Sequence, residues 1–220
     1  MIHHRWDISP AEAIALQKEL AGQVREESLR GEIKTVAGVD CAFTADGRIV
    51  AVAVLCNAKT MAVLATAVEV QPCGFPYISG LLSFREAPAV IAAVKKLHPA
   101  PDLLMCDGQG IAHPRGLGLA SHVGLWLNVP TIGVAKSRLC GQHRMPGAKR
   151  GAKAQLRYQD KTIGAVLRTR DNVRPLYISV GHRITLPECV NWVLRAGEGF
   201  RLPEPTRQAD QRVTRAKKGV

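Results

Sequence analysis

The stretch Lys34-Thr-Val-Ala-Gly-Val-Asp-Cys-Ala-Phe43 combines β-branched and other apolar residues with a single carboxylate, Asp40. Such a run predicts a strand that is largely buried. A carboxylate in that position is costly to bury unless it is paired, hydrogen-bonded or bound to a cation. The stretch therefore predicts a core strand of the fold and, within it, a candidate functional residue.

Two more strands are expected directly after this one. The turn Ala45-Asp-Gly-Arg48 leads into the apolar run 49–56, and a further run covers residues 61–70. Three consecutive strands with short connections predict an antiparallel meander.

The middle of the chain alternates between helix-like and strand-like segments. Residues 83–97 show the apolar periodicity of a helix, and Ser83 and Glu86 have capping-box spacing, which predicts that Glu86 lies in the first turn. An apolar run, a helical stretch and a second apolar run follow at residues 102–108, 116–128 and 131–135. This order predicts two parallel strands joined by a helical crossover.

The remaining segments lie towards the two ends of the chain. Ser9-Pro10 opens a stretch with helical apolar spacing that extends to residue 29, with proline at the first helical position. Further along we expect an exposed basic loop at residues 141–155, strands at residues 162–168 and 176–180, and a helix at residues 187–196. A polar tail follows at residues 197–220, with residues 213–220 as a flexible basic end. The pattern predicts a single α/β domain over residues 1–220, with a mixed central sheet flanked by helices.

The composition is that of an ordinary globular domain, with 220 residues, of which 46% are hydrophobic and 22% charged. No run approaches the roughly 18 apolar residues of a membrane-spanning helix, and the start, Met1-Ile-His-His-Arg5, has no apolar signal core. We therefore expect a cytoplasmic protein without a membrane partner. The six cysteines form no C-x-x-C pair, so we expect them to be reduced and not to bind zinc.

The formal charge of +12 is concentrated in one part of the chain. Residues 1–136 contain 12 basic and 12 acidic residues, whereas residues 137–220 contain 18 basic and 6 acidic residues. A basic surface can simply keep a protein soluble, but it also suits a polyanionic partner, above all nucleic acid. Eight residues of this part, called the basic set below, are expected to bind phosphates: Lys149, Arg150, Lys153, Arg157, Arg212, Arg215, Lys217 and Lys218.

Asp107 repeats the situation of Asp40, because it follows a short apolar run. Acidic residues at the ends of neighbouring strands project into the crevice where ligands bind, so the two can share a divalent ion. Glu86 is either a helix cap or a third ligand. Oxygen ligands suit Mg²⁺ or Mn²⁺, and a basic protein with such an ion suggests hydrolysis of phosphodiesters. Lys136 could add a fixed positive charge, and His113 could position water or transfer a proton.

Seven segments carry a more specific signal. They are Gly38-Val-Asp-Cys-Ala-Phe43; Pro76-Tyr-Ile-Ser-Gly80 with Leu82-Ser-Phe-Arg-Glu86; Asp107-Gly-Gln-Gly-Ile-Ala-His-Pro-Arg115; Leu119-Ala-Ser-His122; Thr131-Ile-Gly-Val-Ala-Lys136; Gly181-His-Arg183; and Arg201-Leu-Pro-Glu-Pro-Thr-Arg-Gln-Ala-Asp210. In this order they resemble endonuclease V, the deoxyinosine 3′ endonuclease. The likeness runs from about residue 10 to residue 212.

The resemblance implies a ribonuclease-H-like fold in which acidic residues on adjacent strands bind Mg²⁺, with Mn²⁺ as a substitute. The catalytic residues that it implies are Asp40, Glu86, Asp107, His113, Lys136 and Asp210, of which Asp40, Glu86 and Asp107 hold the metal. By the sequence alone, Asp210 would be a solvated residue of the polar tail.

The resemblance also implies that deaminated bases, chiefly inosine in DNA, are flipped out of the helix. The second phosphodiester bond on the 3′ side would then be cut, leaving a 3′-hydroxyl and a 5′-phosphate. Tyr77 would stack in the gap, which is worth roughly 1–3 kcal/mol per base. The expected lesion- and DNA-binding residues are Pro76, Tyr77, Ile78, Gly80, Leu82, Arg85, Gly108, Gly118, Leu119 and His122. In an apolar helix, His122 could equally be a hydrogen-bonded core residue.

The chain departs from the family pattern at two positions. The family segment Pro-Tyr-Ile-Pro-Gly reads Pro76-Tyr-Ile-Ser-Gly80 here and is called the wedge segment below. Ser79 lacks the backbone constraint of proline, which predicts a looser wedge. Gln109 stands where some relatives have histidine, and we attach no prediction to that difference.

Other functions explain part of the sequence. A ribonuclease H or a junction resolvase would use similar carboxylates but has no need of the wedge segment. A basic architectural protein would explain the charge but not the carboxylates in apolar strands. Inosine in RNA is an alternative substrate, because only contacts to the 2′-hydroxyl distinguish it. We expect the protein to be a monomer.

Overall fold

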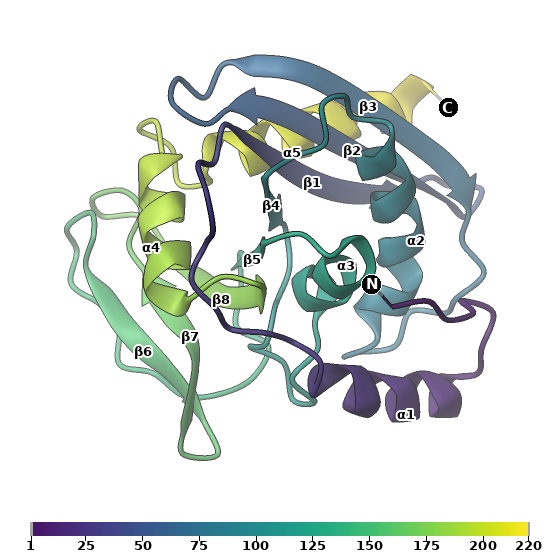
Figure 1. Cartoon of the computed structure of the whole chain (residues 1–220), viewed down its shortest axis with the longest axis horizontal. Coiled ribbons are helices and arrows are strands. Elements are labelled where there is room, and N and C mark those ends of the chain that lie inside the picture. Colours follow the sequence, from purple (N-terminus) through teal and green to yellow (C-terminus); the bar gives the residue numbers. More distant parts are fainter. Residues whose placement is uncertain (1, 220) are drawn as a thin grey trace.

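A mixed sheet of eight strands forms the centre of the computed structural model, which describes residues 2–219 (Figure 1). In chain order the strands are β1 Thr35–Phe43, β2 Arg48–Asn57, β3 Val63–Pro72, β4 Leu103–Cys106, β5 Thr131–Ala135, β6 Lys153–Tyr158, β7 Lys161–Leu167 and β8 Leu176–His182. Their order across the sheet is β3-β2-β1-β4-β5-β8-β7-β6. β1, β4 and β5 are parallel in the middle of the sheet, and the outer pairs are antiparallel.

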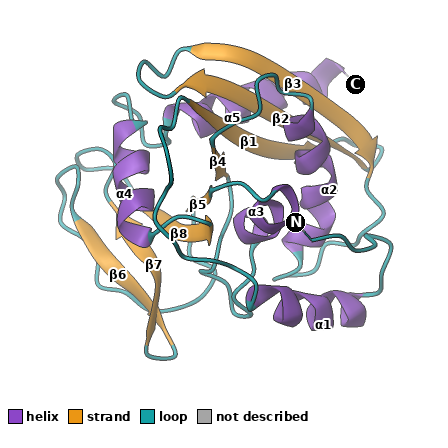
Figure 2. Ribbon diagram, viewed as in Figure 1, coloured by secondary structure: helices purple, strands orange, loops and turns teal. Residues whose placement is uncertain are grey.

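Helices cover both faces of this sheet (Figure 2). They are α1 Pro10–Ala21, α2 Leu82–Lys95, α3 Leu119–Leu127, α4 Leu186–Arg195 and α5 Glu204–Ala216, followed by the short 3₁₀ turn η1 Lys217–Gly219. α2 and α3 pack on the face that presents Val39 and Cys106. α5 packs on the opposite face of β1 and β2, with Val52 and Ala209 in contact, and α4 packs beside β7 and β8.

The predicted α/β fold with a mixed central sheet flanked by helices is confirmed. β1, β2 and β3 form the expected antiparallel meander. β4 and β5 form the expected parallel pair, joined through α3. These elements have strong local signals, since alternating or continuous apolar runs between turn residues leave few other ways to bury the same side chains.

Two details of the predicted helices are wrong. The first helix ends at Ala21 and not at residue 29, because Gly22 forms its C-terminal cap. The second begins at Leu82, so Ser83 lies inside the helix and does not cap it, and Glu86 is beyond the first turn. The hydroxyl of Ser83 is instead hydrogen-bonded to the buried ring of His122, at 3.1 Å.

The C-terminal part contains two elements that the sequence did not reveal. β6 begins at Lys153, inside the segment predicted as a loop, and pairs with β7 at the edge of the sheet. α5 lies within the predicted polar tail. It buries only a narrow stripe that includes Ala209 and Val213, and most of its other residues are polar or charged, so the segment resembles a polar tail in the sequence.

All six cysteines are free thiols, and Cys56, Cys106 and Cys189 are buried. Within residues 2–219, no helix has both the length and the apolar character needed to cross a membrane.

Candidate active site

Two carboxylates meet at the carboxyl end of neighbouring parallel strands. Asp40 lies in β1, and Asp107 follows β4 directly. The register pairs Val39 with Cys106, and the backbone N–H of Asp107 donates to the carbonyl of Val39 at 3.3 Å. Asp40 and Asp107 are therefore neighbours on the same face of the sheet, as the sequence predicted from the two apolar runs.

A third carboxylate comes from α5, on the face that β1 turns towards that helix. Carboxylate oxygens of Asp40, Asp107 and Asp210 lie within 4.8 Å of one another. Gly38 allows α5 to approach this closely, because a Cβ at that position would lie 2.1 Å from the carbonyl carbon of Pro205. Asp210 thus belongs to the acidic cluster, as the resemblance to the family implied, although the residues of its own segment predicted a solvated tail.

Glu86 approaches the cluster from the opposite face of the sheet, since it belongs to α2. It is not one of the three residues whose oxygens lie within 4.8 Å of one another. It is nevertheless close enough for their charges to act on it: burial, and then Asp40 and Asp107, raise its pKa to about 8. The predicted ligand set of Asp40, Glu86 and Asp107 therefore differs from the close cluster, in which Asp210 takes the place of Glu86.

The cluster carries more negative charge than its surroundings neutralise. Burial, followed by repulsion from Asp107, raises the pKa of Asp40 to about 7. Burial also raises the pKa of Asp107, against the opposing effect of Lys136. The ammonium of Lys136 lies 2.5 Å from Asp107 and 2.6 Å from Asp210. Burial opposes the charge on Lys136, but its carboxylate partners outweigh burial and raise its pKa.

The donor set suits a hard divalent cation. It consists of carboxylate oxygens that are partly withdrawn from water and repel one another, with one lysine as their compensating charge. Mg²⁺ and Mn²⁺ prefer oxygen ligands of this kind, whereas zinc sites usually include cysteine or histidine. Asp40, Asp107 and Asp210 could hold such an ion, with Glu86 at the edge of the site.

A cavity of about 380 Å³ opens beside this cluster and is called the site cavity here. Asp107 and Lys136 line it together with His113. Most of the residues predicted to bind the lesion also line it: Tyr77, Ile78, Gly80, Leu82, Gly108, Gly118 and Leu119. Residues that are up to 122 positions apart in the chain, from Gln17 to Leu139, thus form the wall of one cavity next to the carboxylates.

The wedge segment lies at the rim of the site cavity. Tyr77 is 75% exposed, and Pro76 and Ser79 are exposed as well. Ile78 is half-buried and packs against an apolar cluster that includes Ala13 of α1. The wedge segment therefore presents the ring of Tyr77 to the solvent and is anchored by the side chain of Ile78.

Three predicted site residues have surroundings that differ from the expectation. Both ring nitrogens of His113 are occupied: Nδ1 accepts from the backbone N–H of Arg115 at 3.1 Å, and Nε2 is hydrogen-bonded to the carbonyl of Gly80 at 2.9 Å. Burial lowers the pKa of His113 to about 4, so the ring is neutral. Its geometry suits a positioning role and not proton transfer.

His122 is completely buried and cannot touch DNA, so its predicted lesion-binding role is corrected to that of a hydrogen-bonded core residue. Its ring lies between Ser83 and His4, and burial lowers its pKa to about 3. Arg85 does not line the site cavity. It donates to the carbonyl of Phe75 at 3.2 Å, next to the wedge segment, and lies over the ring of Phe43.

Sequence reasoning missed Gln17 and Arg115, which are hydrogen-bonded to each other and to the carbonyl of Gly80, and it assigned no role to Gln109. Gln17 and Gln109 line the site cavity, and the Gln109 amide donates to the carbonyl of Ser137 at 2.9 Å. The Oε1 atom of Gln109 has no hydrogen-bond partner among the described residues. Gln17 lies in α1 at a position that shares the helical spacing of its apolar residues, and this spacing is the only sign in the sequence that its side chain is buried. A glutamine on the buried side of a helix is uncommon, so the spacing could have marked Gln17 as a candidate site residue.

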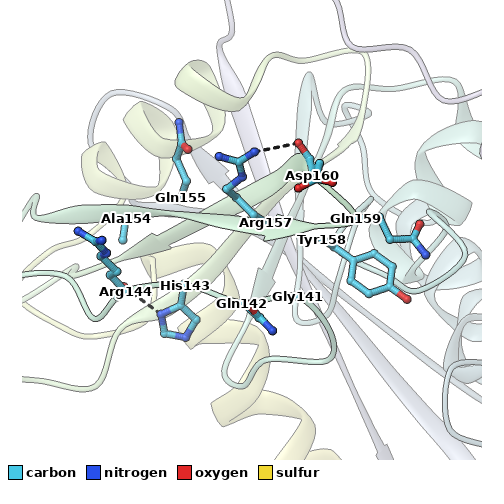
Figure 3. Close-up of a pocket in the computed structure, with 10 residues that line it drawn as sticks. All are labelled: Gly141, Gln142, His143, Arg144, Ala154, Gln155, Arg157, Tyr158, Gln159 and Asp160. Atoms are coloured by element: carbon cyan, nitrogen blue, oxygen red, sulfur yellow. Dashed lines mark hydrogen bonds between the residues drawn. The ribbon is translucent and has the colours of Figure 1, made fainter.

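The basic set does not form one surface. Lys149, Arg150, Lys153 and Arg157 lie around β6, whereas the other four lie at the end of α5 and in η1, towards the other edge of the sheet (Figure 1). Arg157 lines an open cavity of about 950 Å³, together with Arg144 and His143 (Figure 3). None of the acidic cluster lines this larger cavity.

A mixed sheet that delivers carboxylates and a lysine to one edge, beside a cavity, is typical of enzymes that hydrolyse or transfer phosphoryl groups with the help of divalent metals. Comparisons with known proteins specify the family. The family model described as Endonuclease V matches residues 18–211. Endonuclease V of Nostoc punctiforme is 50% identical over 211 residues, which cover 94% of this chain and 95% of the relative.

Solved structures agree with this result. Endonuclease V from Streptomyces avermitilis has a TM-score of 0.93 and 42% identity, and the match covers 99% of this chain and 97% of the other. Endonuclease V of Ciona intestinalis, crystallised with a 24mer DNA that contains an inosine followed by a ribo-adenosine, has the same fold with a TM-score of 0.81 and 24% identity over 95% and 98% of the two chains. The chain belongs to the endonuclease V family, and it is a nuclease, a DNA-cleaving hydrolase.

Proposed function

We propose that this nuclease recognises deoxyinosine in DNA by flipping the base into the site cavity, and that it hydrolyses the second phosphodiester bond on the 3′ side in a Mg²⁺-dependent reaction. The observation that carries the proposal is that one cavity is shared by the wedge segment and by Asp107 and Lys136 of the acidic cluster. A base held there lies beside the groups that would act on its strand. The inosine-containing DNA bound to the Ciona relative is consistent with this substrate.

The site cavity has a suitable size and character for a single base. Small-molecule pockets are mostly apolar with a few polar groups that set orientation, and this one combines Leu82, Leu119 and glycine backbone with a few polar side chains. Tyr77, exposed at the rim, is placed to stack in the gap that a flipped base leaves. The product would carry a 3′-hydroxyl and a 5′-phosphate.

The acidic cluster would hold the metal through Asp40, Asp107 and Asp210, with Glu86 close by. When bound, the ion offsets the charge of the carboxylates and supplies Lewis-acid stabilisation of negative charge on a phosphate. Lys136 contributes a fixed positive charge in a partly water-excluded place, where electrostatic stabilisation of a phosphate is strong. His113 holds the carbonyl of Gly80 and so keeps the wedge segment in place.

The test is nicking of a labelled duplex with one deoxyinosine, in Mg²⁺ or in EDTA, with the cut mapped to the nucleotide. The wild type should cut once, at the second bond 3′ to inosine, only with Mg²⁺. Asp40→Asn should abolish the cut, and Asp46→Asn, in an exposed turn, is the matched control and should leave it unchanged. Equal cutting of undamaged DNA would refute the substrate, and preferential cutting of inosine RNA, hybrids or junctions would favour the alternative nucleases.

A further inference from the structure

We propose that Gln17 of α1 is a positioning residue that fixes the shape of the site cavity, by holding the wedge segment and the segment 115–118 in place next to each other. The inference rests on the proposed function, because it concerns the cavity that would receive the flipped base. It assigns a role to α1, a helix that contributes no residue to the acidic cluster.

The carbonyl of Gly80, at the end of the wedge segment, is held by three side chains. Gln17 Nε2 donates to it at 3.0 Å and Arg115 Nη2 at 2.7 Å, and His113 Nε2 is hydrogen-bonded to it at 2.9 Å. A carbonyl oxygen has two lone pairs, so three donors saturate it. The end of the wedge segment is therefore fixed more firmly than a surface loop normally is.

Gln17 also holds a second backbone segment that lines the cavity. Its Nε2 donates to the carbonyl of Leu117 at 2.6 Å, and its Oε1 accepts from Arg115 Nε at 2.5 Å. Both N–H groups and the carbonyl oxygen of its amide are thus used. Gly80 and Leu117 both line the site cavity, so a single side chain joins two backbone segments of its wall.

The surroundings of Gln17 make this arrangement stiff. Gln17 is 1% exposed and His113 is 4% exposed, and a buried polar group is costly to leave unpaired. A fully satisfied buried network favours one geometry over its alternatives. Gly80 has φ of +80°, and a Cβ there would lie 2.7 Å from Arg115 Nη2, so the network and the glycine depend on each other.

The network also bears on Ser79, which lacks the constraint that proline would give. Because Gly80 directly follows Ser79 and is held at its carbonyl, the network limits the freedom of the wedge segment from its C-terminal side. When the cavity is already ordered, less of the binding free energy is lost in ordering it as a ligand enters. Gln17 therefore acts on base flipping and not on the attraction of the protein to phosphates.

The experiment measures base flipping without cleavage. A duplex with one deoxyinosine next to 2-aminopurine is titrated with protein in EDTA, and the rise in 2-aminopurine fluorescence reports unstacking at the lesion. Gln17→Leu should lower the flipped population, and kcat/KM for the inosine duplex in Mg²⁺ should fall by about tenfold, the effect of one to two net hydrogen bonds. Affinity for the same duplex without inosine should stay at the wild-type value.

Two further variants separate this role from a loss of folding. Gln17→Glu keeps the oxygen that accepts from Arg115 but lacks both N–H donors, so it should behave like Gln17→Leu. Arg115→Met, at a partly exposed position, should act in the same direction, and the double variant should be less than additive because the two residues share the carbonyl of Gly80. Gln23→Leu, exposed just after α1, is the matched control and should match the wild type.

The outcomes distinguish the two proposals. If the wild type cuts the inosine duplex, and Gln17→Leu, Gln17→Glu and Arg115→Met flip the base and cut the strand equally well, then the role of Gln17 is overturned and the proposed function is not. The same holds if inosine and undamaged duplexes lose affinity in parallel in the variants that remain folded by circular dichroism. A wild type that neither flips nor cuts the inosine duplex overturns the proposed function and this inference with it.

Discussion

The replacement Asp40→Asn should make the metal-free protein more stable at pH 8, although it should also remove activity. Burial and the charge of Asp107 raise the pKa of Asp40 from 3.8 to about 7. Each pKa unit corresponds to about 1.36 kcal/mol, so the ionised carboxylate costs the folded state up to about 4 kcal/mol. Asparagine has the shape of the neutral acid without its charge, so this cost disappears in the variant.

The sign follows from proton linkage. Between pH 4 and pH 7 the folded protein retains a proton on Asp40 that the unfolded chain has lost. The free energy of unfolding therefore decreases as the pH rises through this window. The decrease contributed by Asp40 should be complete above pH 7 and absent below pH 4, and the variant should lack it.

The assay is urea unfolding at pH 5 and pH 8 in EDTA, with free energies taken from linear extrapolation. At pH 8, we expect Asp40→Asn to exceed the wild type by about 2–4 kcal/mol, because neighbouring carboxylates share part of the repulsion. Added Mg²⁺ should stabilise the wild type, by about 2.7 kcal/mol at a concentration 100 times Kd, and leave the variant unchanged. A variant less stable than the wild type at pH 8 in EDTA would refute the reasoning, since Asp40 would then gain more from Lys136 than it loses by burial.

Four further changes have defined expectations. Gly38→Ala should push α5 away from β1, because the new Cβ meets the backbone of Pro205, and should lower the free energy of unfolding by about 1–3 kcal/mol. The affinity for Mg²⁺, measured by calorimetry, should fall as well, and an unchanged affinity would show that Asp210 is dispensable for metal binding. Burial lowers the pKa of four histidines, His4, His113, His122 and His182, so the free energy of unfolding should decrease as the pH falls from about 6.5 to 4; thermal melting should show a smaller loss in His122→Gln. Neutralising either half of the basic set should flatten the dependence of DNA affinity on salt, and a slope that stays unchanged in both halves would move the DNA path elsewhere. Ser79→Pro should sharpen selectivity for inosine over mismatched DNA in the nicking assay, and equal selectivity would mean that the bonds to Gly80 already supply the rigidity.

The sequence by itself determined the centre of the fold and two of its carboxylates. Apolar runs between turn residues specify β1 to β5, because a short apolar run between two turns has few ways other than a strand to bury its side chains. Asp40 and Asp107 are conspicuous for the same reason, since each interrupts or ends such a run. The resemblance to the endonuclease V family, confirmed by the comparisons, drew on short strings in these segments.

The tertiary structure alone decided which other residues join them. Asp210 enters the cluster only because α5 packs on β1 at Gly38, a contact between positions more than 160 residues apart in the chain. Glu86 stays outside the close group because α2 lies on the other face of the sheet, and His122 is excluded from DNA by burial. The basic set separates because β6 and α5 lie towards different edges of one sheet. Local patterns specify how a segment buries its own side chains, whereas the face and distance at which two segments meet depend on packing that no single segment contains.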